Sequence, residues 1–271
     1  MTTDQDRRPH ETAAPVVDIN RILGPLPHDD VPSRDETGLT RELDRLGIDT
    51  ACVVHSHALY GDPRDGNGQL DLIDDRRLRP VPVLVPGPLG TDDRYAGTDD
   101  RYADADADRS VADPDRSVDG AAALVRLCPD RHGWGITGPH ALALTAALAR
   151  AGSAVLLAWE AVTPAEVHRL AAAGPGLRIV LTGTGYRSLR DLTELLDTHP
   201  LLYVDTSTLC GHRQVEWFAE RHGAHRVLFG TGAPITDDAG PRHLLDTLDL
   251  PDGDVALIAG GNALRLLGGE A

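Results

Sequence analysis

Residues 153–230 read SAVLLAWEAVTPAEVHRLAAAGPGLRIVLTGTGYRSLRDLTELLDTHPLLYVDTSTLCGHRQVEWFAERHGAHRVLFG. Short runs rich in Val, Ile and Leu alternate here with longer segments whose apolar residues recur at the spacing of a helix. The apolar runs are 153–160, 177–181, 201–205 and 226–230, and the helical segments begin at Thr163, Ser188 and His212. Strands that alternate with helices in this way predict a parallel sheet covered by helices, an α/β fold.

The same alternation extends to both sides of these residues. Strands are expected at 15–20, 49–57, 78–85 and 133–137, and helices at 33–46, 68–77 and 140–151, with further helical segments at 242–248 and 254–267. Eight strands, each followed by a helix or a connection of helical size, predict one closed (β/α)8 barrel of the TIM type. An open, doubly wound sheet is the alternative, but no GxGxxG motif opens any of the helical segments.

One internal segment does not follow the pattern. Residues 90–103 are a perfect tandem repeat of GTDDRYA, and residues 91–119 contain ten Asp and four Arg but no Leu, Ile, Met, Phe or Trp. Such a segment cannot bury enough apolar surface to offset the entropy of ordering it. It is therefore predicted to be a disordered, acidic, low-complexity loop inserted after the third strand. Residues 1–14 are predicted to be a flexible polar leader, and residues 15–271 the barrel domain.

Composition excludes several classes of function. The formal net charge is −16, so the surface repels nucleic-acid phosphates and anionic membranes, and neither is an expected partner. The chain has no Lys, which excludes a Schiff base, a carbamylated lysine between two metal ions and the lysine of a phosphate-binding P-loop. No apolar run is long enough for a membrane span and the first residues carry no signal-peptide core, so the cytoplasm is the expected compartment.

Several segments resemble the barrels of the amidohydrolase superfamily, of the amidohydrolase 2 type. The segment 199–207, HPLLYVDTS, resembles the seventh strand of those barrels, and 218–231, FAERHGAHRVLFGT, resembles their passage into the eighth strand. The segment 258–267, IAGGNALRLL, is similar to their closing helix, and Val17-Asp18 to the start of their first strand. The resemblance implies a barrel whose active site lies at the carboxyl ends of the strands.

The same resemblance implies a divalent metal ion, held by a His-x-His pair on the first strand, a His after each of the fifth and sixth strands and an Asp after the eighth. The corresponding positions here are Asn20 and Ile22, the segment 158–160 (AWE), Gly183 and Gly232. Loss of every imidazole and of the carboxylate removes the donor atoms that bind such a metal, so no resident metal is expected. The chain is thus identified as a divergent member of the family that lacks its metal ligands.

Polar side chains at the ends of the strands could still support catalysis. His55 and His57 end the run 49–57, and side chains two residues apart on a strand face the same way. These imidazoles could exchange protons near neutral pH, with Asp18, Glu160 and Asp205 as partner carboxylates. Alternatively, His55 and His57 could form half of a relocated metal site. In the plainer interpretation the carboxylates cap loops or form salt bridges, and the histidines are ordinary loop residues.

Candidate ligand-binding residues are Asn20 at the end of the first strand, Arg21 directly after it, and Tyr186 and Arg187 after the sixth strand. An Arg at the rim of the barrel could bind a carboxylate through two hydrogen bonds, although a salt bridge to a surface Asp is the alternative. A small molecule is therefore the expected partner, and a homo-oligomer is a further expectation.

Three functions remain open on the sequence alone. The first is an atypical hydrolase or lyase that uses His55, His57, Glu160 and Asp205 on a small polar molecule at the mouth of the barrel. The second is a catalytically inactive barrel that binds a metabolite or a protein partner at the same place. The third is a structural or oligomer-forming subunit whose mouth is inert. Fold resemblance does not choose among them, because one fold hosts many functions.

Overall fold

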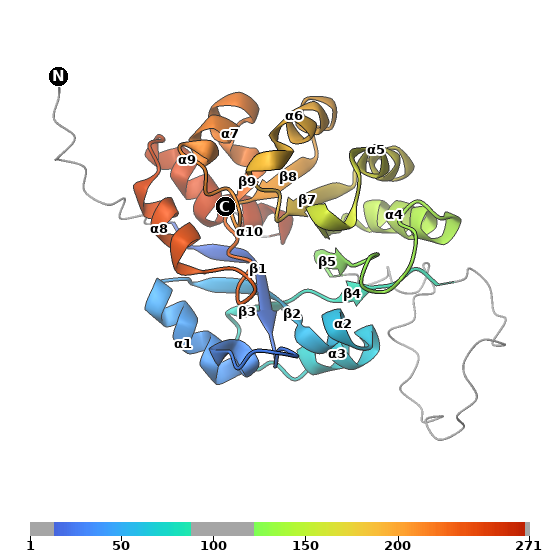
Figure 1. The fold of residues 1–271 in the computed structure, drawn as a ribbon, viewed down its shortest axis with the longest axis horizontal. Helices are drawn as coiled ribbons and strands as arrows, with labels where there is room; N and C mark the ends of the chain where they lie inside the picture. Colours follow the sequence, from blue (N-terminus) through green and yellow to red (C-terminus); the bar gives the residue numbers. More distant parts are fainter. Residues whose placement is uncertain (1–13, 88–121, 269–271) are drawn as a thin grey trace.

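The structure, a computed structural model, describes residues 14–87 and 122–268. The expected acidic loop and all but the last residue of the expected leader lie outside this range, so both stay predictions. The described residues form a ring of parallel strands with helices around it (Figure 1).

The ring is built from short parallel strands. They are β1 (Val17–Leu23), β2 (Thr50–His55), β3 (Leu78–Pro80), β4 (Val83–Leu84), β5 (Leu124–Leu127), β6 (Ala154–Ala158), β7 (Arg178–Thr182), β8 (Leu202–Asp205) and β9 (Val227–Leu228). Strands β1 to β3 pair in chain order in one sheet, and strands β4 to β9 pair in chain order in another. Neighbours in sequence are therefore neighbours in space throughout, as in a barrel of repeated strand–helix units.

The two sheets meet at a proline-rich segment. Pro80 and Pro82 have no N–H to donate, so the ladder is interrupted between β3 and β4. On one side of the interruption, the Val81 N–H donates to the carbonyl of Val53 in β2 (2.8 Å). On the other, the N–H of Arg126 in β5 donates to the Pro82 carbonyl (2.9 Å). Segments β3 and β4 therefore act as one strand between β2 and β5.

The other junction, between β9 and β1, is closed by hydrogen bonds just beyond the end of β9. The Ile19 N–H donates to the Phe229 carbonyl (3.0 Å), and the Gly232 N–H donates to the Asn20 carbonyl (2.9 Å). Eight strands thus complete the ring, which confirms the predicted (β/α)8 barrel.

Helices cover the outside of the ring (Figure 1). They are α1 (Glu36–Leu46), α2 (Ser56–Tyr60), α3 (Pro63–Leu70), α4 (Pro139–Ala151), α5 (Pro164–Ala173), α6 (Leu189–Thr198), α7 (Gln214–His222), α8 (Ala239–Thr247), α9 (Asp252–Ala256) and α10 (Asn262–Leu266), with short turns η1 (Pro32–Arg34), η3 (Trp159–Ala161), η4 (Tyr186–Ser188), η5 (Ala224–Arg226) and the π-helical η6 (Leu257–Gly261). Helix α5 begins at the Thr163-Pro164 pair, where Thr163 and Glu166 cap each other's backbone N–H groups. Over residues 14–87 and 122–268, no helix combines the length and the apolar character that a bilayer span needs.

Each central strand divides its side chains between two apolar layers. On β5, Leu124 packs in the layer inside the barrel with Ile19, whereas Val125 and Leu127 pack in the layer between strands and helices. Because side chains alternate along a strand, Arg126 lies on the inner side, one step closer to the carboxyl end than Leu124.

Two elements expected from the sequence are wrong. Residues 133–137 form no strand; the fourth place in the ring belongs to β5, which lies only a few residues beyond the acidic repeats. The helix expected at 68–77 instead spans Pro63–Leu70, because the Asp62 carboxylate accepts the Arg64 N–H at its start. Asp62 before Pro63 is a helix-start signal, a capping residue followed by Pro at the first helical position.

Candidate functional site

Three polar side chains meet across the carboxyl-end mouth of the barrel. Arg126 on β5 donates from Nη1 to Oδ1 of Asn20 on β1 (2.9 Å). Asn20 in turn donates from Nδ2 to Oδ2 of Asp205 at the end of β8 (3.0 Å). These three residues, which we call the mouth network, connect strands from different sides of the ring (Figure 1).

An irregularity in β1 makes this meeting geometrically feasible. The pairing of β1 with β2 shifts register between Asp18 and Arg21, and the Asn20 N–H donates to the Asp18 carboxylate (3.0 Å). The shift breaks the simple alternation of the strand. Asn20 therefore bonds to groups inside the mouth, whereas Arg21 bonds to Glu42 of α1 on the outside of the ring.

Asp205 is completely buried and is held by three donors. Besides Asn20, its carboxylate accepts the Ser207 hydroxyl (2.9 Å) and the Gly183 N–H (3.2 Å). Burial raises the pKa of Asp205 to about 6, and the donors counter only part of that rise. Its carboxyl group therefore gains and loses a proton close to neutral pH, which an exposed Asp does not do.

Arg126 is the functional candidate that the sequence interpretation missed. Its guanidinium is half-buried, its Nε is buried without a hydrogen-bond partner, and no carboxylate in the described residues pairs with it. A cation in this position is positioned to bind an anion. The available signal was the run LVRLC, residues 124–128, in which one Arg stands among apolar residues of a strand.

Other polar atoms without partners lie on the segments that leave the same ends of the strands. They include Ser56 Oγ after β2, both ring nitrogens of His132 after β5, and Thr184 Oγ1 after β7. Buried polar atoms in folded proteins nearly always have a partner. Each of these atoms therefore has unused hydrogen-bonding capacity.

The two histidines of the sequence prediction do not share a face. Strand β2 ends at His55, and Ser56 begins helix α2, so His57 is helical and exposed. The two imidazole rings pack edge to face with their centroids 4.8 Å apart, and Nδ1 of His55 accepts the His57 backbone N–H (3.2 Å). Burial, with His57 nearby, lowers the pKa of His55 to about 4, so its imidazole is neutral at pH 7.

Asp18 and Arg21 lie in a different network, which we call the β1 clamp. Asp18 is completely buried and accepts both the backbone N–H (3.0 Å) and the hydroxyl (2.6 Å) of Thr231. Arg21 is completely buried and pairs with Glu42 (3.0 Å) and Asp238 (3.2 Å). Burial raises the pKa of Asp18, an effect that Arg21 partly offsets. The clamp joins β1 to the segment after β9 and to α1, and both side chains are engaged with these partners.

The remaining predicted residues lie on the rim. Glu160 is exposed in η3, and Tyr186 and Arg187 are exposed in η4. The structure shows no contact from these three to the mouth network. Their proposed roles stay predictions.

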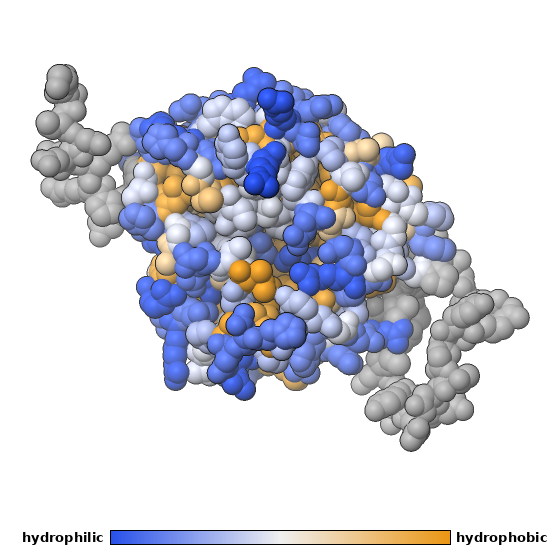
Figure 2. Space-filling view, in the orientation of Figure 1, coloured by the Kyte–Doolittle hydropathy of each residue, from blue (hydrophilic) through white to orange (hydrophobic). Residues whose placement is uncertain are grey.

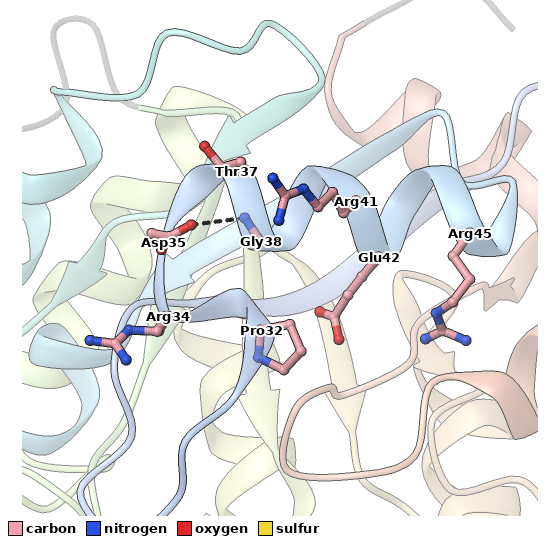
Figure 3. A pocket seen from close by; sticks show the side chains of 8 residues that line it. All are labelled: Pro32, Arg34, Asp35, Thr37, Gly38, Arg41, Glu42 and Arg45. Atoms are coloured by element: carbon pink, nitrogen blue, oxygen red, sulfur yellow. Dashed lines mark hydrogen bonds between the residues drawn. The ribbon is translucent and has the colours of Figure 1, made fainter.

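A second polar feature lies beside α1 (Figure 3). It is a surface cavity of about 560 Å³, with Arg34, Arg41, Glu42 and Arg45 among its lining residues. Arg34 pairs with Asp30 and Arg45 with Asp238, so two of these cations are already engaged.

Figure 2 shows that the face seen in Figure 1 is largely hydrophilic, with its apolar atoms in separate small groups.

The residues at the family's metal positions do not fit a divalent ion. Asn20 is engaged by Asp205 and Arg126, Ile22 packs in an apolar cluster, and Gly183 and Gly232 have no side-chain donors. Among the residues that the structure describes, no group of three or more His, Cys, Asp or Glu side chains is arranged to hold a metal. The guanidinium of Arg126 supplies a positive charge next to Asn20 instead.

Comparison with known proteins agrees with this architecture. Residues 94–269 match the family described as amidohydrolase. No curated protein matches the chain. Among solved structures, the chain is similar to 5-carboxyvanillate decarboxylase LigW from Sphingomonas paucimobilis, with 13% identity, a TM-score of 0.64 and coverage of 94% of this chain and 99% of that one.

Two further structures extend the comparison. A dihydroxybenzoic acid decarboxylase from Polaromonas sp., with bound manganese and the inhibitor 2-nitroresorcinol, has 15% identity, a TM-score of 0.66 and coverage of 94% of this chain and 97% of that one. An uncharacterised TIM-barrel protein from Bordetella bronchiseptica has 16% identity, a TM-score of 0.65 and coverage of 93% and 98%. At these identities the structures support the fold, and the family match covers most of the chain. The chain belongs to the amidohydrolase family.

Proposed function

We propose that this barrel is a lyase that removes the carboxylate from a small, ring-bearing carboxylic acid at its mouth. The observation that carries the proposal is the mouth network, in which an Arg without a carboxylate partner is linked through Asn20 to a buried Asp that titrates near pH 6. Several of the similar structures are decarboxylases of small aromatic acids, which supports this substrate class. At their low identity, that support concerns the kind of reaction and not a particular acid.

Arg126 is proposed to bind the substrate carboxylate. A guanidinium binds a carboxylate through two parallel N–H donors, and Nη1 is already occupied by Asn20. The Nε donor is buried and without a partner, so an incoming carboxylate oxygen would satisfy it. This contact binds and orients the acid, and its loss should therefore raise KM more than it lowers kcat.

Asp205 is proposed to supply the proton that the reaction needs. When the bond from the ring to the carboxylate breaks, CO₂ leaves, the electron pair stays on the ring carbon, and that carbon takes up a proton. Asp205 has no exposed surface, but its partner Ser207 is half-exposed and stands 2.9 Å away. A proton can pass from the Asp205 carboxyl group through the Ser207 hydroxyl, and a donor with a pKa near 6 suits this task.

The reaction is proposed to proceed without the divalent metal of the family, because the residues at those positions offer no donor set for it. Elemental analysis of the purified protein for zinc, manganese, iron and nickel tests this point. Less than about a tenth of an equivalent, unchanged after incubation with each metal, supports the proposal. A stoichiometric metal that activates the protein contradicts it.

The function itself is tested by measuring CO₂ release from a panel of hydroxybenzoates and carboxyvanillates. Turnover by the native protein that is lost in Asp205→Asn supports the lyase. The variant Asp197→Asn, at an exposed position that pairs with Arg221, serves as a control and should keep full activity. Acids that bind in an Arg126-dependent way without turnover would favour the inactive, ligand-binding barrel. No turnover and no binding would overturn both.

A further inference from the structure

A second cavity of about 450 Å³ lies outside the mouth network. It is lined by Tyr186, Leu189, Gly211, His212, Arg213, Gln214, Trp217 and Glu220. These residues come from η4 and α6 after β7, and from α7 and the segment that leads into it after β8. Its size is within the range of small-molecule sites. Arg126, Asn20 and Asp205 do not line it, so its chemistry can be considered by itself.

Two aromatic side chains make this cavity unusual for the chain. Tyr186 is 73% exposed and Trp217 is 41% exposed, although aromatic residues are only 4% of the sequence. Both rings line the same cavity, and aromatic faces favour stacking on another flat ring. Leu189 adds apolar surface beside them.

Gln214 supplies a buried hydrogen-bond donor that lacks a partner. The residue is only 5% exposed, and its Oε1 accepts the Gly211 N–H (3.0 Å). Since the Gly211 group is a donor, the amide oxygen must face it, and the Nε2 group is left as the unpartnered one. The contact depends on glycine, because a Cβ at residue 211 would lie 2.7 Å from Oε1. The chain thus holds this donor in place without using it.

The charges around the cavity disfavour an anion. Arg213 has a left-handed backbone (φ 51°), and its guanidinium is paired with Asp249 (2.6 Å), with Glu220 also near (3.9 Å). Its positive charge is therefore already compensated. Glu220 is itself mostly exposed at the same cavity and adds negative potential. A neutral acceptor on the ligand fits Gln214 better than a carboxylate does.

From these contacts we infer a second small-molecule site, specific for a flat ring that carries an uncharged carbonyl acceptor, such as an aromatic amide. The ring lies against Tyr186 and Trp217, and the carbonyl oxygen accepts from Nε2 of Gln214. This site goes beyond the proposed lyase activity and does not require it.

Binding of 4-fluorobenzamide, followed by fluorine NMR on the full-length protein, tests the inference. The native protein should shift and broaden the probe signal in a saturable way. Gln214→Leu should weaken binding about tenfold, as expected for one lost hydrogen bond to a buried donor. Trp217→Ala should weaken it at least as much. Gln69→Leu, the same change at an exposed position on α3, is the matched control and should leave binding unchanged.

Two further variants separate this site from the mouth. Arg126→Gln should leave binding of 4-fluorobenzamide unchanged, whether or not the lyase proposal holds. Gly211→Ala should weaken binding by displacing the Gln214 amide, and thermal unfolding curves of each variant show whether it is folded. Binding that is insensitive to Gln214→Leu in a folded variant overturns the inference. Loss of 4-fluorobenzamide binding in a folded Arg126→Gln variant would also overturn it, by assigning that ligand to the mouth.

Discussion

The mouth network and the β1 clamp contain the same kinds of groups, yet they differ in how charge is balanced. In the clamp, Arg21 has three carboxylates within 4 Å, those of Asp18, Glu42 and Asp238. In the mouth, Arg126 has an amide oxygen and no carboxylate partner among the described residues. Arg21 is completely buried, whereas Arg126 is half-buried. Removing a buried cation that is paired with carboxylates destabilises the fold, whereas a half-buried cation without a carboxylate partner can bind a substrate.

The largest expected effect is on the clamp. Arg21→Met leaves buried carboxylates without a counter-charge, so the free energy of unfolding should fall by about 3–5 kcal/mol. Urea denaturation followed by circular dichroism measures it. The control is Arg45→Met, which removes an arginine that is 56% exposed and pairs with the same Asp238, and should cost less than about 1 kcal/mol. If Arg21→Met and Arg45→Met lower the free energy of unfolding equally, burial does not distinguish the two arginines.

Asp205→Asn should lower kcat on the acid that the native protein turns over by about 100-fold, because the proton donor is lost while the amide keeps the shape of the site. KM should change little. Asp197→Asn, an exposed position that pairs with Arg221, is the control. If both variants keep native kcat, Asp205 has no part in proton transfer.

Arg126→Gln should raise KM about tenfold, because a charged hydrogen bond to the substrate carboxylate is worth roughly 1.5 kcal/mol. The thermal midpoint should stay close to the native value. Arg187→Gln, at the exposed rim, should leave KM unchanged. The reverse outcome, with KM raised only by the rim variant, would move the anion site from the mouth to η4.

The smallest expected effect is the pH dependence of stability contributed by Asp205. Its folded-state pKa is raised from 3.8 to about 6, so the folded state holds the proton more tightly than the unfolded state. Ionised Asp205 therefore lowers the free energy of unfolding above pH 6, and this loss of stability is relieved as the pH falls from 6 toward 4. Between pH 7 and 5 the native protein should gain about 1 kcal/mol relative to Asp205→Asn. If the difference in stability between the native protein and Asp205→Asn does not change with pH, the pKa of Asp205 is that of an ordinary Asp.

The sequence predicted the barrel well and the site only in part. The strand–helix alternation placed the strands from β6 to β9 and their helices within a few residues. The strand β5 was missed because it is four residues long and lies beside the low-complexity segment. That single error also hid Arg126. Asn20 and Asp205 were predicted as site residues, and the structure shows that they contact each other.

The histidine prediction shows the limit of local patterns. Alternation along 49–57 assumed a strand up to His57, but the chain turns into a helix at Ser56. The sequence His55-Ser56-His57 is compatible with both a strand and a short helix. The packing of α2 against α3 and β2 favours the helix.

The sequence alone was sufficient to predict the barrel, the lack of histidines at the family's metal positions, the absence of Lys chemistry and the start of a helix at Thr163. Each of these depends on residue type or on short-range periodicity. The meeting of Arg126 with Asn20, 106 residues away, required closure of the ring and the register shift in β1. The raised pKa of Asp205 required burial. Long-range contacts and desolvation depend on the assembled barrel, because they arise from surfaces that exist only once all eight strands have come together.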